Sequence, residues 1–205
     1  MTAAAVLGAL GVVLNQVFIW PQVVRALRTT QGVAALSVLG GLLARSLFSV
    51  FGTEIDDRAL VLGNVTVAVG FLLLLVLLLR DAERRLPLLL GGLAVAGVLV
   101  AASAAGGLVL GWTAVVAAAV VNLPQMLRAI TDPDRLAGVS VPTYLLIASA
   151  SSCWLTYGVV VDEPLLSAPH YVLLPTALVV AALASASHRR ASALARSGPG
   201  LPLRP

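Results

Sequence analysis

Long apolar stretches separated by short polar connections run through almost the whole chain. Their lengths, and the Gly, Pro and charged residues that interrupt them, predict helices at 3–27, 33–52, 59–79, 86–105, 108–129, 139–160 and 165–186. Each stretch is close to the roughly 20 residues that a helix needs to cross a bilayer. Residues 188–205, rich in Arg and Pro, predict a disordered basic tail. The pattern predicts an all-α membrane protein with seven transmembrane helices.

Composition supports the bilayer as the solvent. Hydrophobic residues make up 60% of the chain, charged residues 11%, and the mean hydropathy is +1.02, whereas a soluble domain is near half apolar and a quarter charged. The 13 cationic residues are all Arg and are spread over the connections, so the high pI does not indicate nucleic-acid binding. The expected partners are lipid and a small solute.

The arginines also predict the orientation. In a seven-helix arrangement nearly all of them fall on one side, and the other side carries Arg58 beside five acidic residues: Glu54, Asp56, Asp57, Asp162 and Glu163. Because cytoplasmic connections carry the excess of Arg and Lys, we expect the N-terminus outside and the C-terminus in the cytoplasm. The Arg-only composition, rich in Ala, Val and Leu, favours a bacterial plasma membrane.

The chain carries the same three-helix unit twice, and from residue 32 onward the copies align at a fixed offset of 106. The matched pairs are Pro21-Gln22 with Pro124-Gln125, Gly32-Val33 with Gly138-Val139, Ser37 with Thr143, Phe48 with Trp154, Phe51-Gly52 with Tyr157-Gly158, and Asp56-Asp57 with Asp162-Glu163. Three helices reverse the chain's direction, and the unmatched helix 86–105 restores it. We therefore expect a 3+1+3 parallel repeat of three-helix bundles: 1–80, a linker with the inversion helix at 81–106, 107–187, and the tail.

This pattern resembles the PQ-loop superfamily and, within it, the SWEET and SemiSWEET sugar transporters. The resemblance covers about residues 3–186. It implies two triple-helix bundles around a central solute pathway that opens alternately to each side. It also implies hinges of the inner gate near the cytoplasmic helix ends, at Pro21, Pro124 and Pro142. Gln22 and Gln125 can bond across the bundle interface and hold the gate, or can be interfacial amides without that role. The helix-two position that holds a fourth hinge proline in that family is Leu36 here. The prolines could also do no more than shape helix ends.

Four residues within the helices form two matched pairs. Phe48 and Trp154 lie about five residues from one end of their helices, and Asn64 and His170 lie about five residues into theirs. At 1.5 Å per residue all four are expected at one depth, roughly 7 Å inside the outer boundary. An aromatic ring with a polar group suits a sugar, and the resemblance implies that these positions line the binding pocket. Taken singly, such a Trp can be an interface anchor and such an Asn can join helices.

Arg45 lies near the middle of its helix, and no acidic residue in another helix can pair with it. An ionisable residue at such depth is a candidate for a functional site. Together with His170 it favours an anionic or carboxylate-bearing solute. Alternatively, Arg45 faces a water-filled cavity or extends outward toward Glu54 and Asp56. His170 is either a titrating group of a proton-coupled carrier or a neutral residue bonded to a neighbouring helix.

The motifs of known catalytic sites are not found, so we expect no enzyme, cofactor or metal site. The leading hypothesis is a small-solute transporter, with sugar as its substrate, that works by alternating-access facilitated diffusion. The alternatives are a carrier of a small carboxylate or amino acid, with or without proton coupling, and a receptor that binds without transport. A homo-oligomer is compatible with this hypothesis but is not required, because one chain holds both bundles.

Overall fold

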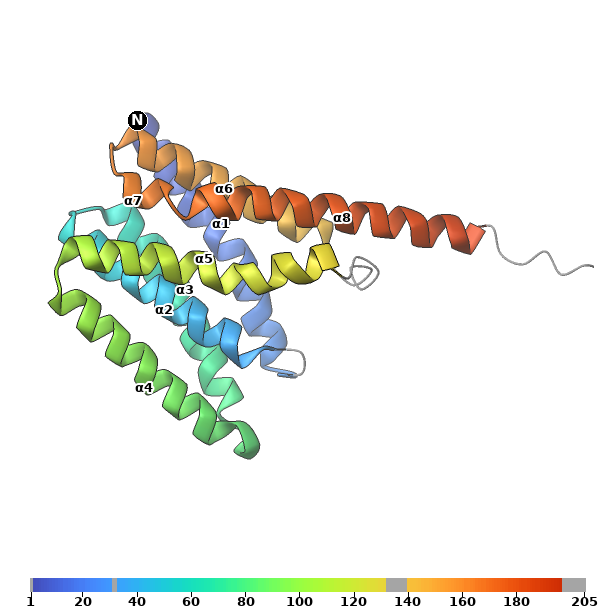
Figure 1. The fold of residues 1–205 in the computed structure, drawn as a ribbon, viewed down its shortest axis with the longest axis horizontal. Helices are drawn as coiled ribbons and strands as arrows, with labels where there is room; N and C mark the ends of the chain where they lie inside the picture. Colours follow the sequence, from blue (N-terminus) through green and yellow to red (C-terminus); the bar gives the residue numbers. More distant parts are fainter. Residues whose placement is uncertain (1, 31–32, 132–139, 197–205) are drawn as a thin grey trace, which may run out of the picture.

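The computed structural model describes residues 2–30, 33–131 and 140–196, and only the backbone at 122–130, 191 and 193–196. All regular structure within these ranges is helical (Figure 1). The helices are α1 Ala3–Ala26, α2 Ala35–Glu54, α3 Arg58–Leu78, α4 Ala82–Ala104, α5 Gly107–Thr131, α6 Val141–Val160, α7 Pro164–Ser167 and α8 His170–Arg196. Most bounds differ from the predicted ones by only a few residues.

Six of the described segments are long and apolar enough to cross a membrane: α1, α2, α3, α4, α6, and Pro164–Arg190. In α5 the stretch with described side chains, Gly107–Val121, is apolar but shorter. The prediction of an all-α, multi-pass membrane protein is confirmed.

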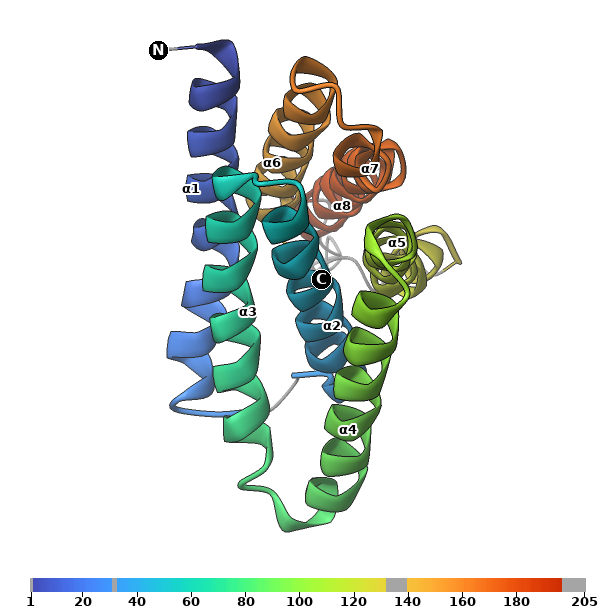
Figure 2. The ribbon, with the colours of Figure 1, turned by 90° about the vertical axis from the view of Figure 1, so that its left-hand side faces the viewer.

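The two halves of the chain pack their helices in the same order. In the first half α3 lies between α1 and α2, and in the second half α8 lies between α5 and α6 (Figure 2). The halves meet where α1 contacts α6 and where α2 contacts α5, which are equivalent pairs under the repeat. The fourth helix, α4, lies against α2 and α5 and leads the chain back to the side where α1 begins (Figures 1 and 2). This arrangement is the 3+1+3 parallel repeat.

The repeat extends to the backbone of the turns that end α2 and α6. Asp56 and Asp162 both have a left-handed conformation, with φ of 57° and 56°. In each turn the next residue donates its N–H to the carbonyl oxygen of a helical glycine, Gly52 at 2.8 Å and Gly158 at 2.9 Å. This is the hydrogen bond of a Schellman cap, which satisfies a helix-end carbonyl.

The predicted single helix 165–186 is wrong in one respect, because the structure divides it. The short α7 ends at Ser167, and α8 begins at His170 after a turn at Ala168 and Pro169. Proline has no N–H to donate, so the helical hydrogen bond at Pro169 cannot form. In the first half the equivalent position is Gly63, and α3 runs through it without a break.

The predicted disordered tail is also corrected in part, because α8 continues to Arg196. Residues 188–196 are rich in Ala and Arg, both of which favour helix. Residues 197–205 lie outside the described residues. The prediction gave too much weight to charge and too little to helix propensity.

Buried side chains form three cores. The side of the molecule where α1 begins is called the N-terminal side, and the side where α8 ends the C-terminal side (Figure 1). A shared core near the N-terminal side joins both bundles: Leu47, Phe48, Phe51, Leu60, Ala102, Leu110, Ala114, Val115, Trp154, Tyr157 and Leu166. Toward the C-terminal side each bundle has its own core, one built on residues such as Ile19 and Leu74 and the other on residues such as Ala177 and Val180.

Candidate functional site

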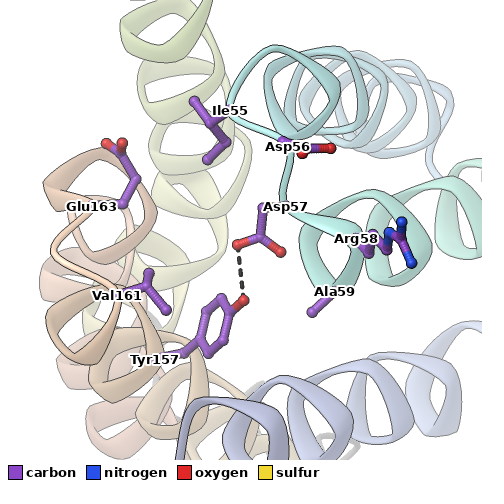
Figure 3. A pocket seen from close by; sticks show the side chains of 8 residues that line it. All are labelled: Ile55, Asp56, Asp57, Arg58, Ala59, Tyr157, Val161 and Glu163. Atoms are coloured by element: carbon purple, nitrogen blue, oxygen red, sulfur yellow. Dashed lines mark hydrogen bonds between the residues drawn. The ribbon is translucent and has the colours of Figure 1, made fainter.

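A hydrogen bond closes the two bundles against each other on the N-terminal side. The Tyr157 hydroxyl, from α6, donates to Asp57 Oδ2 at 2.8 Å (Figure 3). The other carboxylate oxygen of Asp57 accepts the Leu60 N–H at 2.9 Å and so caps α3. Next to this bond lies an outer cavity of about 450 Å³, lined by Ile55, Asp56, Asp57, Arg58, Ala59, Tyr157, Val161 and Glu163.

Trp154 fills a notch between α1 and α3 of the opposite bundle. A Cβ added to Gly11 would lie 2.8 Å from its Cε2, and one added to Gly63 would lie 3.0 Å from its Cζ2. The indole also meets the Tyr157 ring edge to face, with centroids 5.6 Å apart. Its Nε1–H is buried and has no hydrogen-bond partner. In this state Trp154 therefore holds the two bundles together.

Phe48, the partner of Trp154 under the repeat, lies in the same shared core and is 6% exposed. The structure therefore brings together the two aromatic residues singled out from the sequence. Both belong to the contact that joins the bundles near the N-terminal side.

Arg45 has a partner, and it is not an acid. Its Nη1 donates to Asn64 Oδ1 at 3.0 Å, while Asn64 Nδ2 donates to the Leu60 carbonyl oxygen at 2.9 Å. Asn64 is 2% exposed, so these bonds hold its amide in place within the bundle. Arg45 also lies within electrostatic range of His170, whose Nδ1 is buried without a hydrogen-bond partner. Arg45, Asn64 and His170 thus form one group, and the guanidinium does not extend to Glu54 or Asp56.

The predicted hinge and gate residues with described side chains, Pro21, Gln22 and Pro142, have less distinctive surroundings. Pro21 lies in α1, which continues through it, and Gln22 is exposed and has no side-chain hydrogen bond to the described residues. Pro142 lies in the first turn of α6, where its missing N–H costs little. Pro124 and Gln125 lie in α5, but their side chains are outside the described residues. Their hinge and gate roles stay predictions.

Two features of the site were not identified as functional from the sequence. One is the bond between Tyr157 and Asp57. Both residues were used to align the repeats, and Asp57 also to predict the orientation. The other is Asn15 of α1, which is 3% exposed and whose Nδ2 is buried without a partner. An amide inside an apolar helix was the signal available for Asn15.

The fold is similar to that of a solved structure of a eukaryotic SWEET transporter. The likeness has a TM-score of 0.79 at 15% sequence identity, and it covers 91% of this chain and 97% of that one. No family model matches the chain, and no curated protein matches it significantly. The structural likeness shows a SWEET-like fold. The PQ-loop repeats stay a prediction from the sequence.

Proposed function

We propose that this protein carries a small solute across the membrane by alternating access between its two bundles. The observation that carries this proposal is the unequal contact between them. A shared core and the Tyr157–Asp57 bond join the bundles on the N-terminal side. Toward the C-terminal side the buried side chains of the described residues form a separate core in each bundle, and the bundles still touch there where Val121 packs against Gly40. Such a molecule can open toward one side while it is sealed on the other, and the seal is built from contacts that can exchange.

The distribution of charge supports an orientation for this state. Seven arginines with described side chains lie toward the C-terminal side, at helix ends, in connections or in α8: Arg25, Arg28, Arg80, Arg84, Arg85, Arg189 and Arg190. By the positive-inside rule that side faces the cytoplasm. The structure then represents a state that is closed to the outside. The plasma membrane is the expected location.

Sugar is the solute class that the family resemblance implies, and facilitated diffusion is the simplest mechanism. Trp154 and Asn64 match the tryptophan and asparagine of that pattern, whereas Phe48 and His170 depart from it. Asn64 is already bonded to Arg45 through its oxygen and to Leu60 through its amide, which reduces what it offers to a sugar hydroxyl. The class of solute is therefore the main question for experiment.

The proposal is tested by uptake of labelled solutes into proteoliposomes that contain the purified full-length protein. The panel holds neutral sugars, amino acids and small organic acids, each at two pH values. We expect saturable uptake of at least one solute that stops when its inside and outside concentrations are equal. Intact protein that moves none of them would contradict transport, and binding without uptake would indicate a receptor. A rate that is the same at both pH values would remove proton coupling through His170.

A further inference from the structure

Polar residues from four helices lie at one level of the molecule, just beyond the shared core. Asn15 is four residues past Gly11, Arg45 three before Phe48, Asn64 four past Leu60 and His170 four past Leu166. Each reference residue belongs to the shared core or, in the case of Gly11, contacts Trp154 within it. Given the direction of each helix (Figure 1), Asn15, Arg45 and Asn64 lie one turn toward the C-terminal side, and His170 begins α8 after the break at Pro169, within electrostatic range of Arg45. We call Asn15, Arg45, Asn64 and His170 the polar layer.

The polar layer offers hydrogen-bond donors in excess. Arg45 has five N–H groups, and its side chain makes one hydrogen bond to the described residues, to Asn64. Asn15 Nδ2 is buried without a partner, and His170 Nδ1 can donate in the tautomer that carries its proton there. The layer's acceptors are fewer: Asn15 Oδ1, Nε2 of His170 in that tautomer, and Asn64 Oδ1, which already accepts from Arg45. A sugar hydroxyl needs an acceptor as well as a donor, whereas a carboxylate only accepts.

The charge of the polar layer also favours a carboxylate as the ligand. Among the described residues the one ion pair, between Arg84 and Asp81, lies at the start of α4, and Arg45 has no acidic partner. A cation without an anion is costly to keep at this depth, and a bound carboxylate would supply the missing charge with two parallel N–H···O bonds. An amino acid would also need acceptors for its ammonium group, and the layer has no carboxylate to offer it. These conditions together fit a small monocarboxylate.

On the basis of the proposed transport function, we propose that the polar layer binds the carboxylate of a small monocarboxylate, with Arg45 as its main ligand. The layer lies where the shared core ends and the two separate cores begin. A solute that enters between the bundles from the C-terminal side would meet Arg45 before it met Phe48 and Trp154. The shared core then blocks its further movement until the bundles exchange their contacts.

The experiment compares lactate with glucose in proteoliposomes that contain the full-length protein. Two variants change the proposed ligand: Arg45→Gln keeps an amide donor for Asn64, and Arg45→Lys keeps the charge. The control is Arg80→Gln, at an exposed arginine after the end of α3. We expect wild-type protein to carry lactate, Arg45→Gln to reduce lactate uptake by about tenfold or more, and Arg45→Lys to reduce it less. Arg80→Gln should match the wild type.

The melting temperature of each purified variant, with and without lactate, shows whether it is folded and whether it binds. Lactate uptake that survives Arg45→Gln would overturn the proposal, and so would wild-type uptake of glucose without lactate. If no solute moves at all, transport has failed, and the binding site is judged on its own. If lactate raises the melting temperature of the wild type and Arg45→Gln abolishes this rise, the proposed carboxylate site is supported. If lactate does not raise the melting temperature of the wild type, the proposed site is overturned. The proposed site would also be overturned if chloride raised the melting temperature as much as lactate does.

Discussion

Apart from the break before α8, the two repeats share the arrangement of their backbone, but they differ in the side chains that face the other bundle or lie in the polar layer. Their helices pack in the same order, and the turns after α2 and α6 have the same φ and the same hydrogen bond to a glycine. Yet Tyr157 replaces Phe51, and Ser151 stands where the first repeat has Arg45. The first repeat thus supplies the charge of the polar layer, and the second supplies the hydroxyl that closes the N-terminal side. The two halves therefore share an arrangement of helices, whereas the chemistry is divided between them.

The sharpest test of the shared backbone is a pair of glycine substitutions. A Cβ on Gly158 would lie 2.8 Å from the Ser167 backbone nitrogen, and one on Gly52 would lie 3.1 Å from the Val61 nitrogen. We expect Gly158→Ala to cost roughly 3 kcal/mol of stability and Gly52→Ala nearer 1 kcal/mol, because a backbone atom cannot move aside easily. Thermal unfolding of the purified protein measures both.

The control for this pair is Gly97→Ala in α4, where nothing lies within 4 Å of the added Cβ. It should leave the stability unchanged or raise it slightly, because Ala favours helix over Gly. Equal losses at Gly158 and Gly97 would show that the turns are not as tightly packed as the structure indicates.

A smaller effect is expected from Tyr157→Phe, which gives the second repeat the side chain of the first. The hydroxyl bond to Asp57 is lost, so opening of the N-terminal side should become easier by about 1 to 2 kcal/mol, or roughly five- to thirtyfold. A cysteine placed at Ala59, which lines the outer cavity, would report opening through its reaction rate with a membrane-impermeant maleimide in a Cys153→Ser background.

Tyr171→Phe serves as the matched control, because Tyr171 is 64% exposed. Tyr171→Phe should not change the rate at which the maleimide labels the cysteine introduced at position 59. If Tyr157→Phe also left it unchanged, the bond to Asp57 would not contribute to closure.

The smallest effect concerns a chain of hydrogen bonds found between α1 and α3. Trp20 Nε1 donates to Gln16 Oε1 at 2.9 Å, and Gln16 Nε2 donates to Thr66 Oγ1 at 2.6 Å. The second repeat has Val172 at the position of Thr66. Thr66→Val should lower the melting temperature by the equivalent of about 0.6 kcal/mol, the average for such bonds between membrane helices. A loss of several kcal/mol would mean that the first bundle depends on this chain and the second does not.

Much of the fold could be predicted from the sequence, because apolar length and repeated residues are local signals. Seven spans, the parallel repeat and the inversion helix follow from them. The break before α8 was missed because hydropathy does not report a missing backbone N–H. Pro169 was the residue in the sequence that could have indicated the break.

The site was predicted only in part. Alignment of the repeats paired Asn64 with His170, each in its own bundle, and therefore did not show that Asn64 meets Arg45 within one bundle. That contact depends on how α2 packs on α3, and this packing cannot be derived from one sequence. For the same reason Trp154 was expected to line the pathway, whereas its surroundings at Gly11 and Gly63 are those of a packed residue.

The shared core has a consequence for how the rate of such a carrier depends on temperature. In the proposed alternating-access cycle, each passage to the opposite state separates Phe48 and Trp154 from the other bundle and exposes to water surfaces that are buried in this structure. Wetting apolar surface carries a large positive heat-capacity change, so the enthalpy of opening itself varies with temperature. A carrier sealed in this way has no single activation energy, and a plot of its turnover against reciprocal temperature is curved.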